Sequence, residues 1–277
     1  MIGFWRLYAR SPSAVVGLVL LLAVIGMALT AGIFFPKNPL ALAGPPLLWP
    51  FQDAQLWLGT DNSGRDIAAQ IFHGARISLL IGLAAMALAI TIGIVLGALA
   101  GFYGGIADDI LMRITEAFQT LPNFLLLLML VAVFGSTLTT VTIAIGLVSW
   151  QAPARLTRAE FLSLRTREFV QAGRTIGLGD ATLIFREILP NALPPVIVYA
   201  SVVMAVAILL ESALAFLSLS DPNVASWGNL IGLGRAVLRT AWYVSAIPGI
   251  AILITVLAVS LVGQGLNDAL NPRLRGR

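Results

Sequence analysis

The chain has 277 residues, of which 58% are hydrophobic and only 11% are charged, and its mean hydropathy is +0.93. Soluble domains are about 45–50% apolar and about 25% charged, so this composition indicates an integral membrane protein. The net charge of +4 is compatible with loop charges that orient a protein across a bilayer. With no cysteine and a single histidine, His73, the sequence excludes disulfides, thiolate nucleophiles and histidine clusters for metals.

Uncharged stretches of about 20 residues mark candidate membrane-spanning helices. The stretch at 117–154 is long enough for two helices, separated by a turn at Gly135-Ser136-Thr137. The stretch at 188–210 continues past one carboxylate, Glu211, to Phe216. Together with the stretches at 11–36, 77–107 and 240–267, this predicts an all-α polytopic membrane protein with six transmembrane helices.

The basic residues predict how these helices are oriented. With a cytoplasmic N-terminus, twelve of the seventeen fall on cytoplasmic segments: Arg6, Arg10, Arg113, Arg155, Arg158, Arg165, Arg167, Arg174, Arg186, Arg273, Arg275 and Arg277. The other five, Lys37, Arg65, Arg76, Arg235 and Arg239, fall outside. This excess agrees with the positive-inside rule, so both termini are expected in the cytoplasm.

These boundaries divide the chain into a cytoplasmic N-terminus at 1–13, a first transmembrane helix at 14–35, an extracytoplasmic loop at 36–76 and a core of five transmembrane helices at 77–277. The core includes a cytoplasmic loop at about 156–190. A cleaved signal peptide is the alternative for the first helix. The run is long and no small-residue cleavage pattern follows it before Pro36, so we expect an anchored helix.

The sequence offers no catalytic constellation. The only lysine, Lys37, follows Pro36, so the chain lacks the glycine-rich phosphate-binding loop that ends in Gly-Lys-Ser/Thr. His73 is predicted in the outer loop, away from any serine at membrane depth. We therefore expect no catalytic residue, no metal and no cofactor in this chain, and an energy source on another subunit.

Two features inside the predicted helices stand out. Gly93, Gly97 and Gly101 are four residues apart and predict a face where another helix approaches closely. Glu211 lies deep in an uncharged span, where a carboxylate costs on the order of 2.5–3.5 kcal/mol on insertion scales. It should face the bundle interior or water, and two roles stay open: fixing a neighbouring helix or lining a translocation path.

The cytoplasmic loop predicts two helical pieces. In the first, apolar and small residues share one side and Arg167 and Arg174 lie opposite; that side comprises Leu162, Phe169, Ala172, Gly173 and Ile176. Gly177-Leu178-Gly179 breaks the chain, Asp180 is a candidate N-cap, and residues 181–188 form a short helix that Pro190 ends. A short helix exposed to the cytoplasm is typical of a docking device.

Several motifs resemble one family. Gln171-Ala172-Gly173-x-x-x-Gly177, with Leu189-Pro190 following, resembles the EAA loop of ABC importer permeases, although Gln171 and Gly173 replace its Glu and second Ala. Further segments are similar to the C-type permeases of dipeptide, oligopeptide and nickel importers: Leu58-Gly59-Thr60-Asp61-x-x-Gly64-Arg65-Asp66, Gly74-Ala75-Arg76-x-Ser78-Leu79, Glu211-Ser212-Ala213-Leu214-Ala215-Phe216, Ser226-Trp227-Gly228 and Asn271-Pro272-Arg273. The resemblance therefore covers nearly the whole chain.

The resemblance implies the type I ABC importer permease fold in the cytoplasmic (inner) membrane of a bacterium or archaeon. It also implies the partners: a second homologous permease forming a heterodimer, two ATPases that carry ATP and Mg, and an extracytoplasmic solute-binding protein, with no nucleic acid. Residues expected to couple to an ATPase are Gln171, Ala172, Gly173, Arg174, Gly177, Asp180, Leu183, Ile184, Phe185, Arg186, Ile188, Leu189 and Pro190. Candidates to face the binding protein are Gly59, Thr60, Asp61, Gly64, Arg65 and Asp66, and Glu211 is the translocation-path candidate.

The function favoured by this resemblance is the uptake of dipeptides or oligopeptides by alternating access. A permease for nickel or another small solute is the nearest alternative. A secondary transporter or channel working alone would need several intramembrane titratable groups or an internal repeat, and the sequence shows one secure carboxylate and no repeat. A membrane enzyme lacks paired catalytic residues, and a scaffold subunit stays open.

Overall fold

The computed structural model of the chain describes residues 8, 9 and 11–270, and within them the regular structure is helical apart from two isolated β-bridges. The two chain ends lie outside these residues. Predictions for Arg6, Arg10, the Asn271-Pro272-Arg273 motif, Arg275 and Arg277 therefore stay predictions, as does the cytoplasmic location of both termini.

Four helices of the described chain are long and apolar enough to cross a membrane. They are α2 (Pro12–Phe34), α3 (Ile67–Tyr103), α12 (Tyr243–Leu270) and a continuous run of α9 (Asp180–Thr182), the π-helix η1 (Leu183–Ile188) and α10 (Leu189–Phe216). They correspond to the first, second, sixth and fifth predicted spans. At about 1.5 Å per residue, the 37 residues of α3 form a helix that is longer than the roughly 30 Å thickness of a membrane's hydrocarbon core.

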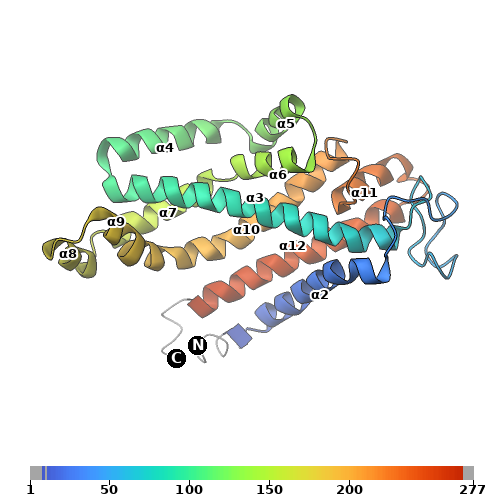
Figure 1. Cartoon of the computed structure of the whole chain (residues 1–277), viewed down its shortest axis with the longest axis horizontal. Coiled ribbons are helices and arrows are strands. Elements are labelled where there is room, and N and C mark those ends of the chain that lie inside the picture. Colours follow the sequence, from blue (N-terminus) through green and yellow to red (C-terminus); the bar gives the residue numbers. More distant parts are fainter. Residues whose placement is uncertain (1–7, 10, 271–277) are drawn as a thin grey trace.

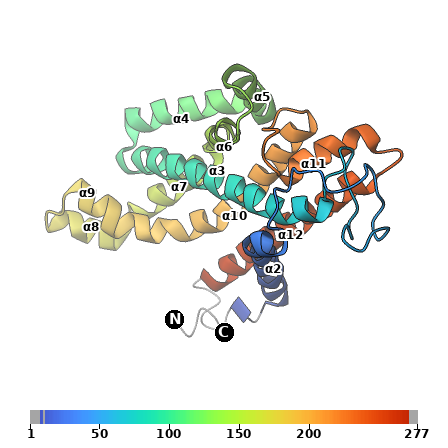
Figure 2. The same ribbon diagram turned by 45° about the vertical axis from the view of Figure 1, so that its right-hand side comes forward.

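The long helices run along the longest axis of the molecule (Figure 1). The helix α8 (Glu168–Thr175) and α9 lie at one end, and the loop at 36–66 lies at the opposite end. α3 lies between α4 on one side and the packed pair of α2 and α12 on the other, as both ribbon views show (Figure 2). The two longest loops expected from the sequence are thus at opposite ends.

The third and fourth predicted spans are broken rather than straight. α4 (Gly105–Thr120) and α5 (Asn123–Phe134) together have the length and apolarity of a span but meet at an 84° bend beside Pro122. α6 (Leu138–Leu147) and α7 (Gln151–Leu164) then follow the predicted turn. By length and composition, the described chain therefore has four helices that could each cross a membrane, and a fifth span if the bent pair is counted as one.

Charged residues that were used to delimit the third predicted span lie within a helix. α4 carries Asp108, Asp109, Arg113 and Glu116, and one of them is neutralised across the bundle. The guanidinium of Arg158 on α7 donates to both oxygens of Asp108, with Nη2 2.6 Å from Oδ2. This bidentate pair links α4 to α7.

The glycine face of α3 packs closely against α7, as predicted. A Cβ at Gly93 would lie 2.5 Å from the Cβ of Pro153, and one at Gly101 would lie 2.6 Å from the Cβ of Phe161. At Gly97 a Cβ would overlap the carbonyl oxygen of Ala154. The absence of side chains therefore lets α3 and α7 form the most extensive helix contact of the fold.

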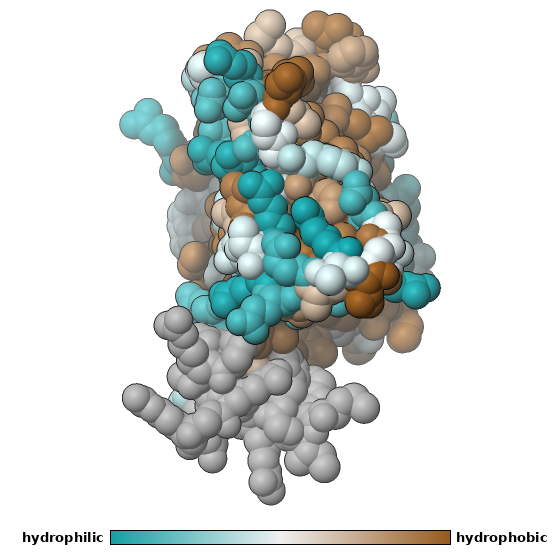
Figure 3. Space-filling model, turned by 90° about the vertical axis from the view of Figure 1, so that its left-hand side faces the viewer, coloured by the Kyte–Doolittle hydropathy of each residue, from teal (hydrophilic) through white to brown (hydrophobic). Residues whose placement is uncertain are grey.

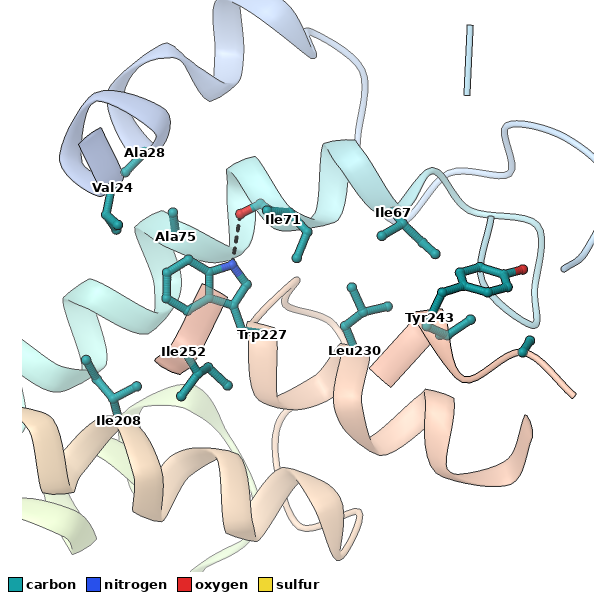
Figure 4. Packing of buried hydrophobic residues seen from close by; sticks show 12 residues of the cluster. Val24, Ala28, Ile67, Ile71, Ala75, Ile208, Trp227, Leu230, Tyr243 and Ile252 are labelled. Carbon is teal, nitrogen blue, oxygen red and sulfur yellow. Dashed lines mark hydrogen bonds between the residues drawn. The ribbon is translucent and has the colours of Figure 1, made fainter. Parts of the chain in front are cut away.

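A buried cluster near the loop end positions α11 (Trp227–Gly234), which η2 (Arg235–Val237) follows. Trp227 is fully buried among residues of α2, α3 and α12, and its indole Nε1 donates to the carbonyl oxygen of Ile71, 2.9 Å away (Figure 4). Its backbone N–H also faces the hydroxyl of Ser78. These contacts hold the start of α11 against α3.

Candidate functional site

The turn after α8 is a glycine-dependent helix ending. Gly177 has φ +82, in the left-handed region that glycine adopts without strain. The N–H of Leu178 donates to the carbonyl of Gly173, and the N–H of Gly177 donates to that of Arg174, both at 3.0 Å. This is the Schellman hydrogen-bond pattern, so the glycine of the EAA-like motif ends α8 and turns the chain toward α9.

The second half of the segment differs from the prediction. Gly179, not Asp180, is the N-cap of α9, and Asp180 occupies the first turn without a side-chain capping bond. Pro190 does not end the helix either. The N–H of Leu189 donates to the carbonyl of Ile184, five residues back, and the wider π-helical turn leads directly into α10, whose first turn contains Pro190. A proline is tolerated there because its missing N–H lies where the hydrogen bonding already changes.

Only part of the expected apolar contact surface is accessible. Leu183, Ile184 and Ile188 are buried in a cluster of the chain's own residues, and Phe185 is 66% exposed. Three of the four large apolar residues at 183–188 therefore pack within this chain. Phe185 is the one that projects outward.

The predicted apolar side of α8 is also only partly right. Gly173 is buried as expected, but Phe169 and Ile176 are exposed and Val170 is buried in their place. Leu162 belongs to α7, and the turn at 165–167 changes the helical phase between the two helices. Ile176 is 77% exposed, so it joins Phe185 as an apolar residue at this end.

Basic side chains also belong to this segment of the chain. Arg174 lies over the ring of Phe102, with Cζ 5.6 Å from the centroid, and Arg165 donates to the carbonyl of Gly101 at 3.1 Å. Gln171 and Arg186 are exposed. Viewed from this end, hydrophilic side chains gather over the surface with isolated hydrophobic ones among them (Figure 3). A surface of this kind suits a polar protein partner rather than lipid tails.

Glu211 faces the bundle interior, as predicted. Its side chain is buried at 2% exposure. The hydroxyl of Ser226 donates to Oε1 at 2.7 Å, and the same hydroxyl oxygen accepts from the N–H of Asn229 at 3.1 Å as the N-cap of α11. Oε2 has no hydrogen-bond partner in the described chain and faces Gly228. The carboxylate thus joins α10 to the start of α11.

The Gly59–Asp66 run folds into a tight turn. Gly59 and Gly64 have φ +78 and +81. Asp61 is fully buried, and its carboxylate accepts from the N–H of Ser63 at 2.8 Å and from Nε2 of Gln70 at 3.0 Å. The carboxylate therefore fixes the turn onto α3.

The remaining candidates of this run are also mostly internal. Thr60 is fully buried, with its hydroxyl donating to the carbonyl of Pro45 at 2.6 Å. Asp66 accepts from the N–H of Ala68 at 2.8 Å and caps α3. Burial raises the pKa of the Asp66 carboxyl, while backbone hydrogen bonds from Ala68 and Ala69 lower it. Of the six candidates for the binding-protein surface, only Arg65 and Asp66 are partly exposed.

Two residues that contribute to this turn were not identified from the sequence. Gln70 holds Asp61, and the hydroxyl of Tyr243 donates to the carbonyl of Leu48 at 2.8 Å, which attaches the loop to α12. The signal that could have identified Gln70 is its polar side chain in the first turn of an otherwise apolar helix. Nothing local indicates Tyr243, since its partner is far away in the sequence.

The described residues contain no group of three or more His, Cys, Asp or Glu side chains that could hold a metal ion. The chemistry of the sites is therefore packing, hydrogen bonding and charge pairing.

Comparisons with known proteins agree with this architecture. A family model for the "Binding-protein-dependent transport system inner membrane component" matches residues 93–276. The di/tripeptide transport system permease protein DppC of Pseudomonas aeruginosa is 39% identical and aligns over 98% of this chain and 92% of its own. The glutathione transport system permease protein GsiD of Pectobacterium atrosepticum is 36% identical, over 98% and 91%.

A solved structure shares the fold at low sequence identity. The MetNI methionine ABC transporter in an inward-facing conformation superposes with a TM-score of 0.60 and 17% identity, and the match covers 72% of this chain and 94% of that chain. This likeness supports the type I importer fold predicted from the sequence.

Proposed function

Since the chain belongs to the family of inner membrane components of binding-protein-dependent transport systems, we propose that it is a permease subunit that carries small peptides into the cytoplasm. The observation that carries this proposal is near-full-length similarity to permeases named for di/tripeptides, dipeptides and glutathione. The relatives' names favour peptides over nickel, the nearest alternative. ATP hydrolysis belongs to separate ATPase subunits, because this chain has no phosphate-binding loop.

In the proposed importer, two ATPases, a second permease and an extracytoplasmic solute-binding protein complete the complex in the inner membrane, with both termini of this chain in the cytoplasm. The residues from α8 to η1 dock on one ATPase. Phe185 and Ile176 supply apolar anchors, and Arg174 and Arg186 supply surrounding charges. Since α9, η1 and α10 form one continuous run, a displacement of α9 moves α10 directly.

Three further sequence predictions take a more specific form. In the coupling segment, Gly177 contributes by ending α8, and Leu189 and Pro190 contribute by joining η1 to α10. Glu211 braces α11 and does not line the path, because both its burial and its bond to Ser226 are within this chain. The turn at 59–66 shapes the outer surface and leaves direct contact with a binding protein to exposed neighbours such as Phe51.

The proposal is tested by uptake of radiolabelled dipeptide, longer peptide and nickel in a deletion strain that expresses the chain with its neighbours. We expect peptide uptake and co-purification of an ATPase pair and a second permease. Recovery of the chain alone, or uptake of nickel but not of peptide, would contradict it.

The docking step is tested by the matched pair Phe185→Ala and Leu183→Ala. Removing the exposed Phe185 ring should reduce uptake and peptide-stimulated ATP hydrolysis at least about tenfold, as for a hot-spot residue worth about 2 kcal/mol, without changing thermal stability. Removing the buried Leu183 should lower stability by roughly 2–5 kcal/mol. Normal coupling in a stable Phe185→Ala complex would refute the assigned contact.

A further inference from the structure

A pocket of about 350 Å³, lined by both polar and apolar residues, lies at the loop end of the molecule. The outer loop, the α5–α6 turn, the segment between α10 and α11, and α11 itself surround it; these elements lie at the end opposite α8 in Figure 1. Its polar lining residues are Arg65, Gln70, Ser136, Ser218, Ser220 and Asn229. Arg65 is the one charged residue among the described residues that line it, so the pocket carries a positive charge without a carboxylate to balance it.

The guanidinium of Arg65 has no partner in the described part of the chain. Its Nε is buried without a hydrogen bond, and no described carboxylate is within ion-pair distance. The acids that adjoin it in sequence are engaged elsewhere: Asp61 accepts from backbone N–H groups and Gln70, and Asp66 caps α3. The terminal nitrogens of this guanidinium have no hydrogen-bond partner among the described residues, so a ligand with paired acceptor oxygens would find its donors free there.

Two of the other polar residues of the wall, Ser220 and Asn229, are already paired. Ser220 donates its hydroxyl to Oδ1 of Asn229, and Nδ2 of Asn229 donates to the carbonyls of Asp221 and Val224, the latter at 2.8 Å. The hydrogen bonds of these two residues are therefore internal to the chain. Arg65 is the one charged donor with free hydrogen-bonding capacity among the described residues that line the pocket.

The geometry points to this pocket as a binding subsite for a carboxylate, which Arg65 holds through the two terminal nitrogens of its guanidinium. Guanidinium groups bind carboxylates in this bidentate way, and a lysine does not reproduce it. The inference rests on the proposed function: the carboxylate is the C-terminus of the peptide at the outer mouth of the permease. A volume of about 350 Å³ is at the lower end of small-ligand sites, roughly 300–1,000 Å³, which suits the end of a peptide.

The test uses the complete importer reconstituted in liposomes with its binding protein. Initial uptake of a dipeptide and of the same dipeptide with a C-terminal amide is measured for the wild type, Arg65→Gln, Arg65→Lys and the control Arg239→Gln. Arg239 is an exposed outer arginine that does not line the pocket. Each rate is recorded against the concentration of loaded binding protein, with ATP hydrolysis measured in parallel.

We expect Arg65→Gln to lower the maximal uptake rate of the free-acid dipeptide at least about tenfold, which corresponds to about 1.4 kcal/mol. Uptake of the amide and stimulated ATP hydrolysis should change less than twofold, Arg65→Lys should recover only part of the rate, and Arg239→Gln should behave as the wild type.

Three results would overturn the inference. Equal losses for the acid and the amide would make Arg65 a structural residue. A rise in the concentration of binding protein needed for half-maximal uptake, at an unchanged maximal rate, would assign the carboxylate to the docked binding protein. Unchanged uptake in Arg65→Gln would remove the subsite. A wild-type complex that transports neither dipeptide would instead refute the proposed function itself.

Discussion

Glu211 illustrates how a single buried carboxylate shapes this fold. One oxygen accepts the hydroxyl of Ser226, which also caps α11, so a change at Glu211 reaches the start of that helix and Trp227 beside it. The other oxygen faces Gly228, where any side chain would meet it at 2.7 Å. These contacts favour the proposed bracing role, for which charge is not required.

We therefore predict that Glu211→Gln assembles and transports like the wild type, because its amide oxygen can still accept from Ser226. Glu211→Ala should destabilise the protein by about 1–3 kcal/mol, since it leaves the Ser226 hydroxyl without this acceptor. The measurements are the thermal unfolding midpoint of the purified complex and peptide uptake. A stable Glu211→Gln complex without uptake would contradict this prediction and would support a role for Glu211 in lining the translocation path.

At this scale, the sequence predicted the turns better than the directions of side chains. The glycines at 59, 64 and 177 have the positive φ that turn-forming positions require. Asp61 was a candidate for the binding-protein surface because it lies in the outer loop, with pairing inside the loop as the alternative. Its carboxylate is instead buried and accepts from Gln70 of the following helix. Such a contact leaves no local periodic pattern, so only the folded structure shows it.

At the scale of elements, apolar length identified the long helices, and the failures occur where tertiary contacts alter that pattern. α4 carries four charges, and its pairing through Asp108 with Arg158 could not be read from local sequence. Pro190 predicts a helix end by propensity, but the π-helical turn before it absorbs the missing hydrogen bond. The glycine face of α3 was predictable because its four-residue spacing is itself the packing signal.

The α3–α7 contact leads to a prediction from two glycine-to-alanine changes. Gly97→Ala should destabilise the protein by about 1–3 kcal/mol, as overpacking does, because its methyl group would overlap the carbonyl of Ala154. Gly26→Ala on α2 meets no atom within 4 Å and should be neutral or stabilising by about 0.5–1 kcal/mol. Thermal unfolding of the two variants in detergent compares them, and equal midpoints would show that α3 and α7 do not pack this closely.

At the scale of the whole molecule, the two ends differ in chemistry. The end with α8 and α9 is hydrophilic with isolated apolar residues (Figure 3). The outer loop, at the opposite end in Figure 1, contains exposed aromatic residues, Phe51 and Trp57. Charge asymmetry in the sequence predicted the first end as the cytoplasmic one. The long helices between the ends connect the proposed ATPase surface to the proposed outer subsite.

The absence of cysteine makes this orientation directly measurable. Ile176→Cys and Phe51→Cys introduce single thiols at positions 77% and 81% exposed, at opposite ends of the chain. In intact spheroplasts, a membrane-impermeant maleimide should label Phe51→Cys, and it should label Ile176→Cys only after the membrane is permeabilised. The cysteine-free parent chain is the control for background. Labelling of Ile176→Cys from outside would invert the predicted topology, and with it the assignment of α8 and α9 to the ATPase side.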